Sequence, residues 1–131
     1  MDIGMKKEKY HIEYVFDTVS RRSLWNHLTT PPGLASWFAD DISVYDNKYI
    51  FKWDKQEEEA EIVAMKPEMS VRYHWVAEED DSTYFEFRIH IIELTGGTAL
   101  EITDFADPDE KQDAIELWDS QIIELKRTLG I

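Results

Sequence analysis

Cysteine is absent from the 131 residues, so the chain cannot form disulfides, thiolate zinc sites or a cysteine nucleophile. Basic residues are scarce: 14 Lys and Arg against 28 Asp and Glu leave a formal net charge of -14. Such a chain repels phosphate backbones and anionic lipids, which argues against binding to nucleic acid or to a membrane surface. No hydrophobic run approaches the roughly 20 residues that span a bilayer, so membrane insertion is not expected.

Glycine and proline are also few, at 5 and 4 residues, and they form no linker between segments of different composition. We therefore expect one domain over residues 1–131. The first residues carry charge without an apolar stretch behind it, which favours a cytoplasmic protein over one with a targeting segment. Either Met1 or Met5 could be the natural start.

What the chain does have is a large aromatic content, 13% of residues with five Trp, distributed over a clear order of elements. Period-two alternation predicts strands, and apolar spacings of three and four predict helices. The order is a strand, two short helices, a series of strands and a long helix. The predicted strands are 10–16, 42–45, 48–53, 59–65, 70–76, 84–94 and 98–105, with 84–94 the longest, and Ser20 and Thr30 begin the two short helices.

The last helix is predicted from Asp107, which can act as N-cap, followed by Pro108 at the first helical position and Glu110 in a capping box. One apolar stripe follows along it: Ile115, Trp118, Ile122, Leu125 and Leu129. A long amphipathic helix against a one-sided antiparallel sheet is an α+β architecture.

The stretch 23–38, SLWNHLTTPPGLASWF, resembles the signature of START-like proteins, also called the SRPBCC superfamily. It is most similar to the branch related to heat-shock-chaperone ATPase activators, in which a helix Trp precedes a Leu-Thr-x-Pro turn and a Trp-Phe pair. Trp118, Ile122, Leu125 and Lys126 resemble that branch's final helix. The resemblance implies a helix-grip fold, in which a curved antiparallel sheet wraps around the C-terminal helix and often leaves a cavity beside it.

Large apolar side chains are predicted on the sheet face that meets the final helix. They either form an ordinary packed core or line a pocket for an apolar or aromatic small molecule. The hydroxyl groups of Tyr10, Tyr14, Tyr49 and Tyr73, together with Asp104, would supply the polar contacts. The candidate ligand-binding residues are Trp37, Phe38, Trp53, Tyr73, Trp75, Phe87, Ile89, Trp118 and Ile122.

Catalytic, metal and cofactor sites are not expected. The four histidines have no metal-ligand spacing, and strand parity places His11, His74 and His90 on the solvated face of the sheet. No Gly-x-Ser-x-Gly occurs, and the acidic runs lack the spacing of a calcium loop. Asp104 is the one acid whose parity points inward, near a strand end where its hydrogen bonds can be satisfied.

Three functions remain open. The first is a binding module for a small hydrophobic or aromatic ligand held between the sheet and the C-terminal helix. The second is a protein-interaction module like the chaperone ATPase activators, because an acidic surface favours basic partners. The third and weakest is a cyclase- or hydratase-type enzyme, because the inward faces offer almost no titratable group.

Charge also predicts the register of the hairpin that joins strands 70–76 and 84–94. Placing Arg72 opposite Glu86 pairs opposite charges, whereas the registers with Arg88 or His90 place basic groups together. The same register sets Tyr73 opposite Phe85 and leaves Glu78 to Asp81 in the connecting loop.

Overall fold

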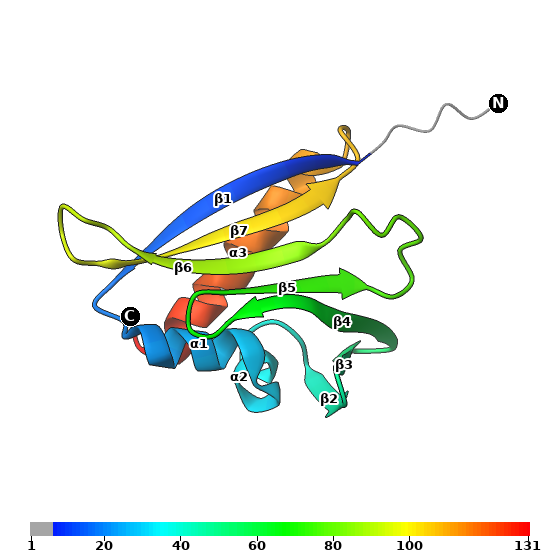
Figure 1. Cartoon of the computed structure of the whole chain (residues 1–131), viewed down its shortest axis with the longest axis horizontal. Coiled ribbons are helices and arrows are strands. Elements are labelled where there is room, and N and C mark those ends of the chain that lie inside the picture. Colours follow the sequence, from blue (N-terminus) through cyan, green and yellow to red (C-terminus); the bar gives the residue numbers. More distant parts are fainter. Residues whose placement is uncertain (1–6) are drawn as a thin grey trace.

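The computed structural model describes residues 7–131, so the alternative starts Met1 and Met5 lie outside the described residues. Seven strands and three helices follow one another in the predicted order (Figure 1). The elements are β1 (Glu8–Asp17), α1 (Arg21–Thr29), α2 (Pro31–Ala35), β2 (Asp41–Tyr45), β3 (Lys48–Trp53), β4 (Gln56–Lys66), β5 (Ser70–Trp75), β6 (Phe85–Ile91), β7 (Thr98–Ala106) and α3 (Lys111–Leu129).

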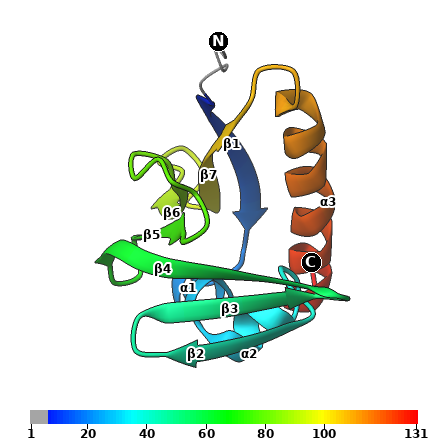
Figure 2. The same cartoon turned by 90° about the vertical axis from the view of Figure 1, so that its right-hand side faces the viewer.

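The strands form one antiparallel sheet in the order β1-β7-β6-β5-β4-β3-β2. Strands β2 to β6 each pair with the next strand in the chain, whereas β1 pairs with β7 at the other edge of the described sheet. The sheet curves, and α3 crosses its concave side, with α1 and α2 at one end (Figures 1 and 2). This is the α+β helix-grip architecture that the sequence predicts.

Both short helices begin where the sequence predicts. The Ser20 side chain accepts a hydrogen bond from the Ser23 N–H at 3.1 Å, and Thr30 accepts one from the Gly33 N–H at 3.1 Å. Gly33 is required by close approach, because a Cβ there would lie 2.2 Å from the Asn26 carbonyl oxygen. The two helices are therefore packed backbone against backbone at this point.

The start of α3 differs from the prediction. Asp107 does not cap the helix; its carbonyl accepts the Glu110 N–H at 2.9 Å in a separate turn, and Glu110 is the N-cap without a side-chain bond. Proline at position 108 suits the first position of this turn as well as that of a helix, so the local pattern fits both structures. The stripe itself is confirmed: Trp118, Ile122 and Leu125 are buried, and the residues at both ends of the stripe are partly buried against the core.

The observed strand lengths also differ from the predicted ones. The strand expected over 84–94 ends at Ile91, and β4, with 11 residues, is the longest. A turn takes the place of the last predicted strand residues. In it, the Gly96 N–H donates a hydrogen bond to the Ile92 carbonyl at 2.7 Å, and Gly96 has a φ of 73°. Leu94 lies at its tip and is 97% exposed, so apolar character alone extended the predicted strand too far.

The predicted register between β5 and β6 is confirmed. Arg72 lies opposite Glu86 and Tyr73 opposite Phe85, and Arg72 Nε lies 3.0 Å from a Glu86 carboxylate oxygen. The Arg72 guanidinium also lies over the Tyr84 ring, 3.8 Å from its centre. Glu78 to Asp81 lie in the connecting segment, as expected.

His74 is on the convex face that strand parity assigns to it, but it is not solvated. It is only 7% exposed, and its Nδ1 lies 2.8 Å from the Thr83 carbonyl oxygen in the β5–β6 connection. The connection folds back over the ring, which parity cannot predict because it describes only the strand. His11 is exposed and His90 is half-buried.

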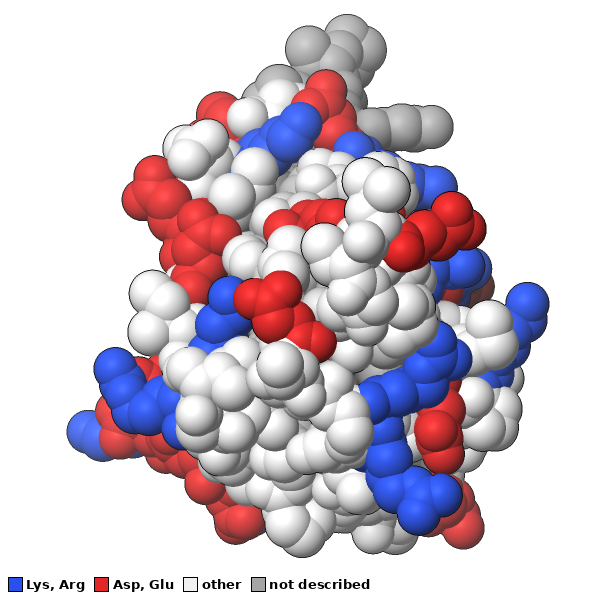
Figure 3. All heavy atoms as spheres, turned by 90° about the vertical axis from the view of Figure 1, so that its left-hand side faces the viewer, with Lys and Arg blue, Asp and Glu red and all other residues white. Residues whose placement is uncertain are grey.

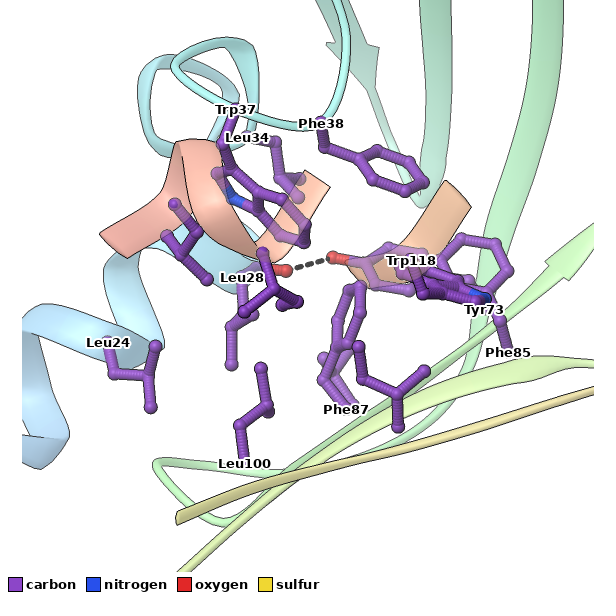
Figure 4. Close-up of a cluster of buried hydrophobic side chains, with 14 of the residues drawn as sticks. Leu24, Leu28, Leu34, Trp37, Phe38, Tyr73, Phe85, Phe87, Leu100 and Trp118 are labelled. Atoms are coloured by element: carbon purple, nitrogen blue, oxygen red, sulfur yellow. Dashed lines mark hydrogen bonds between the residues drawn. The ribbon is translucent and has the colours of Figure 1, made fainter. Parts of the chain in front are cut away.

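The core fills the space between the sheet, α1, α2 and α3. Figure 4 shows Leu24, Leu28 and Leu34 of the short helices facing Phe87 and Leu100 of the sheet. Tyr73 is fully buried there and donates its hydroxyl hydrogen to the Leu28 carbonyl at 2.7 Å. This bond satisfies the one polar atom of the Tyr73 side chain.

Candidate ligand pocket

A cavity of about 380 Å³ lies between the first half of α3 and the adjacent end of the sheet. Figure 2 faces this end of the molecule, where the β3–β4 turn reaches toward α3. We call the cavity the aromatic pocket. Its lining is Phe38, Trp53, Trp75, Phe85, Asp104, Ala114, Leu117, Trp118 and Gln121.

Five rings of this lining form a closed series of neighbours. Between ring centres, Phe38 lies 5.7 Å from Trp53, Trp53 lies 6.2 Å from Trp75, and Trp75 lies 4.9 Å from Phe85. Phe85 lies 6.4 Å from Trp118, which stacks on Phe38 at 5.8 Å with an interplanar angle of 20°. These are the separations of favourable aromatic contacts.

The strand ends explain why the rings converge. Trp53 ends β3, Trp75 ends β5 and Phe85 begins β6, and antiparallel pairing brings these termini to one end of the sheet. Phe38 comes from the segment after α2, and the Trp53 indole N–H donates to its carbonyl at 2.7 Å. Trp53 and Trp75 are only half-buried, so part of each indole surface is available to a ligand.

Asp104 is the one ionisable side chain in the described lining of the aromatic pocket. One carboxylate oxygen accepts the Trp118 indole N–H at 2.9 Å and the Tyr10 hydroxyl at 3.3 Å, and the other accepts the Phe105 N–H at 2.7 Å. Burial raises the pKa of Asp104 above its ordinary value, and these three hydrogen bonds oppose the rise. The carboxyl is therefore a satisfied group at the rim, as the sequence predicts.

Three further cavities adjoin the aromatic pocket, and the smallest, of about 120 Å³, shares Trp75 and Asp104 with it and is also lined by Lys7. One of about 410 Å³ shares Phe38, Trp53 and Gln121 with it, and one of about 300 Å³ shares Trp53 and Trp75. The first is also lined by Ala35, Ser36, Trp37, Ala39, Asp40 and Glu124, and the second by Glu58, Ala77 and Glu78.

The structure divides the predicted ligand residues into two groups. Phe38, Trp53, Trp75 and Trp118 line the aromatic pocket, and Trp37 lines the adjoining 410 Å³ cavity. The other predicted residues are buried side chains that line none of these four cavities: Tyr73, Phe87, Ile89 and Ile122. The pocket thus lies at one end of the predicted aromatic face, and the middle of that face is packed core.

Sequence reasoning missed Phe85, Ala114, Leu117 and Gln121 as lining residues. Phe85 has the same strand parity as Phe87, so the signal was present. Ala114 precedes Trp118 by four positions and Gln121 follows it by three, so both share its helix face and helical spacing could have identified them. Leu117 is the adjacent residue, which this spacing does not indicate.

The tyrosine hydroxyls expected in the pocket are used elsewhere. Tyr49 donates to the Thr29 carbonyl at 2.8 Å, and Tyr14 donates to Asp119 at 2.7 Å. Tyr10 reaches the pocket only through Asp104. Desolvation raises the pKa of Tyr14, as it does that of Tyr10.

Among the described residues, no group of three or more His, Asp or Glu side chains could hold a metal ion. A search of the same residues for a helix that is both long and apolar enough to cross a membrane also finds none.

The helix-grip fold, with a pocket beside its long helix, is the structure that the resemblance to START-like proteins implies. Comparison of the sequence with models of protein families identifies the same class. A model of the START-like superfamily domain matches residues 4–131, so the chain belongs to this superfamily. A comparison with proteins of curated function finds no match.

Several solved structures are similar to this chain. The solution structure of BfR322 from Bacteroides fragilis is 44% identical, with a TM-score of 0.69 over 97% of this chain and 94% of that one. The Aha1 dimer from Colwellia psychrerythraea is 19% identical, with a TM-score of 0.78 over 95% and 97%. DynU16, described as a putative protein in the dynemicin biosynthetic locus, is 15% identical, with a TM-score of 0.75 over 92% and 46%. The last two show a shared fold.

Proposed function

We propose that this protein binds a small hydrophobic or aromatic ligand in the aromatic pocket. The observation that carries the proposal is the closed series of five rings around a cavity of about 380 Å³. Ligand sites are typically concave and mostly apolar, with a few polar groups, and measure about 300–1,000 Å³. This cavity is at the small end of that range and suits a compact molecule.

Phe38, Trp53, Trp75 and Trp118 are the proposed direct contacts. Water in such a cavity finds few hydrogen-bonding partners, so an apolar molecule that displaces it gains free energy. The fully buried members of the predicted set support the walls from behind: Phe87 lies 5.9 Å from Trp118 between ring centres, and Tyr73 lies 5.0 Å from Phe85.

A filling substitution tests the proposal. Ala114 lines the pocket from α3, so Ala114→Trp should occupy it, whereas Ile123→Trp adds the same ring at an exposed position of that helix. We expect 1-naphthalenemethanol to bind the unmodified protein and Ile123→Trp equally in isothermal titration calorimetry. Ala114→Trp should lose at least about tenfold in affinity. Equal binding to all three proteins would contradict the assignment.

Native mass spectrometry of protein purified from cells provides an independent test. A co-purifying small molecule should appear with the unmodified protein and be reduced in Ala114→Trp. A bound molecule retained fully by that variant would place the ligand elsewhere.

A protein-interaction function is the second candidate. It is supported by the fold shared with the Aha1 dimer, by the net charge of -14 and by the edge strand β2, where Val44 and Tyr45 are exposed. A pull-down from lysate at low salt that yields no partner would argue against it. Under either function, we propose that the protein is cytoplasmic.

A cyclase- or hydratase-type reaction has less support. It needs positioned titratable groups at the reacting atoms, and Asp104 alone represents them in the described lining of the aromatic pocket.

A further inference from the structure

Acidic side chains outnumber basic ones around the aromatic pocket. Together with the adjoining cavities of about 410 and 300 Å³ it is lined, in the described part of the chain, by five acids and no base, and Lys7 lines the adjoining cavity of about 120 Å³. The five acids are Asp40, Glu58, Glu78, Asp104 and Glu124. On the opposite side of the molecule, basic and acidic side chains lie interspersed (Figure 3).

Partners within the protein neutralise only some of these acids. Glu78 binds Lys7 at 2.6 Å, and Glu124 pairs with Arg127. Among the described residues, Asp40, Glu58 and Asp104 have no basic side chain within ion-pair distance. A negative potential therefore persists at the pocket.

Asp104 is the acid that lies beside the rings and can contact a ligand among them. Its three hydrogen bonds leave at least one acceptor position on the oxygen that binds the Phe105 N–H, because a carboxylate has about four such positions. Lys7 is a base close enough to act on Asp104 electrostatically, and it lines the adjoining cavity of about 120 Å³. Lys7 already forms an ion pair with Glu78. The carboxylate can thus accept a hydrogen bond from a ligand.

Aromatic rings contribute in the same direction. The faces of Trp, Phe and Tyr rings carry negative charge density and attract cations within about 6 Å, most strongly for Trp. Three of the five rings around this pocket are indoles: Trp53, Trp75 and Trp118. A wall of rings that ends at a carboxylate is the chemistry that recognises an ammonium group attached to an apolar body.

We infer that the ligand of the aromatic pocket is a small organic cation, with an aromatic or apolar body among the rings and a protonated amine at Asp104. This inference rests on the proposed function and specifies its ligand class. Carboxylate ligands, including fatty acids, are disfavoured because their charge would lie in the pocket with Asp104 and near the acids of the adjoining cavities.

Three probes with one naphthalene body separate the possibilities. At neutral pH, 1-naphthylmethylamine is a cation, 1-naphthalenemethanol is neutral and 1-naphthoate is an anion. In isothermal titration calorimetry at low salt we expect the amine to bind at least about tenfold more tightly than the alcohol, and the anion to bind least. Equal affinities for the amine and the alcohol would overturn the inference and leave the proposed function standing. Absence of binding by both would overturn the two together.

The variant Asp104→Asn assigns the selectivity to one group. The amide keeps an oxygen that can accept from Trp118 and Tyr10, so the alcohol should bind within about twofold of its original affinity, and the preference for the amine should disappear. Glu116→Gln removes the same charge from an exposed position of α3 that lines none of these cavities, and should keep the preference. Retained preference in Asp104→Asn would refute the role of this carboxylate.

Should Asp104→Asn fail to fold, salt gives the same answer on the unmodified protein. Raising the ionic strength from about 0.01 M to 1 M shortens the Debye length from ~30 Å to ~3 Å. The affinity of the amine should fall severalfold, and that of the alcohol should not. A parallel change in both affinities would contradict an electrostatic preference.

Discussion

Truncation of Trp118 is the most direct test of how α3 is held. The indole is 6% exposed, stacks on Phe38 and donates its N–H to Asp104 at 2.9 Å. Removal of a large buried aromatic side chain costs about 3–5 kcal/mol, and the lost hydrogen bond to a buried carboxyl adds about 1 kcal/mol. Because the site adjoins the aromatic pocket, water can enter the space and offset part of this loss. We expect Trp118→Ala to lower the free energy of unfolding by about 4 kcal/mol.

Urea denaturation followed by circular dichroism measures this effect, and two variants divide it into parts. Trp118→Phe keeps a ring and removes the donor, so it should cost about 1–2 kcal/mol. Leu117→Ala changes a neighbour that is 60% exposed and should cost less than about 1 kcal/mol. A loss below about 1 kcal/mol for Trp118→Ala would refute the reasoning, because it would mean that the ring contributes little to the core.

Three other outcomes are expected. Burial gives Asp104 a pKa above its ordinary 3.8 in the folded chain. Its stabilising contribution is therefore present at low pH and is lost as the pH rises through the folded pKa. In a urea series, the stability of Asp104→Asn relative to the unmodified protein should increase between about pH 3 and 7, and a constant difference over this range would contradict the raised pKa. Gly33→Ala places a Cβ 2.2 Å from a backbone oxygen of α1 and should cost about 1–3 kcal/mol in the same assay; an unchanged midpoint would show that the two helices separate freely. Arg72→Ala removes the closer of the two basic partners of Glu86, whose side chain is 9% exposed and keeps only Arg88 at 3.6 Å, and should cost about 1–2 kcal/mol; a loss that high salt abolishes completely would mean that the pair is solvated.

The sheet was predictable because its strands carry an alternating apolar pattern, and in β3 the burial follows that pattern. Tyr49, Phe51 and Trp53 share the inner face as their period requires, and charge selected the correct register for Arg72. These signals are local or involve one hairpin. The burial of His74 depends instead on how the β5–β6 connection folds back over the strand, and strand parity contains no information about it.

The candidate site was predictable in its face but not in its extent. Parity placed Trp53, Tyr73, Trp75 and Phe87 on one side of the sheet, and the structure agrees. Whether a ring packs or lines a cavity depends on its position along the strand. Tyr73 is covered by α1 and donates its hydroxyl hydrogen to the Leu28 carbonyl, whereas Trp53 and Trp75 lie at strand ends and line the cavity. That difference arises from three-dimensional curvature, which sequence spacing does not encode.

The pairing of the first strand with the last affects how the chain is made. Glu8 lies opposite Ala106, so during synthesis β1 emerges long before the strand that will hold it, and in the described sheet it has no other partner. The rings of the aromatic pocket are completed later still, because Trp118 on α3 follows every described strand in the sequence. Until these later elements have been synthesised, the nascent protein exposes an unpaired strand and uncovered indoles, which are surfaces that promote aggregation and attract chaperones. Closing so distant a contact also predicts slow folding for a domain of this size.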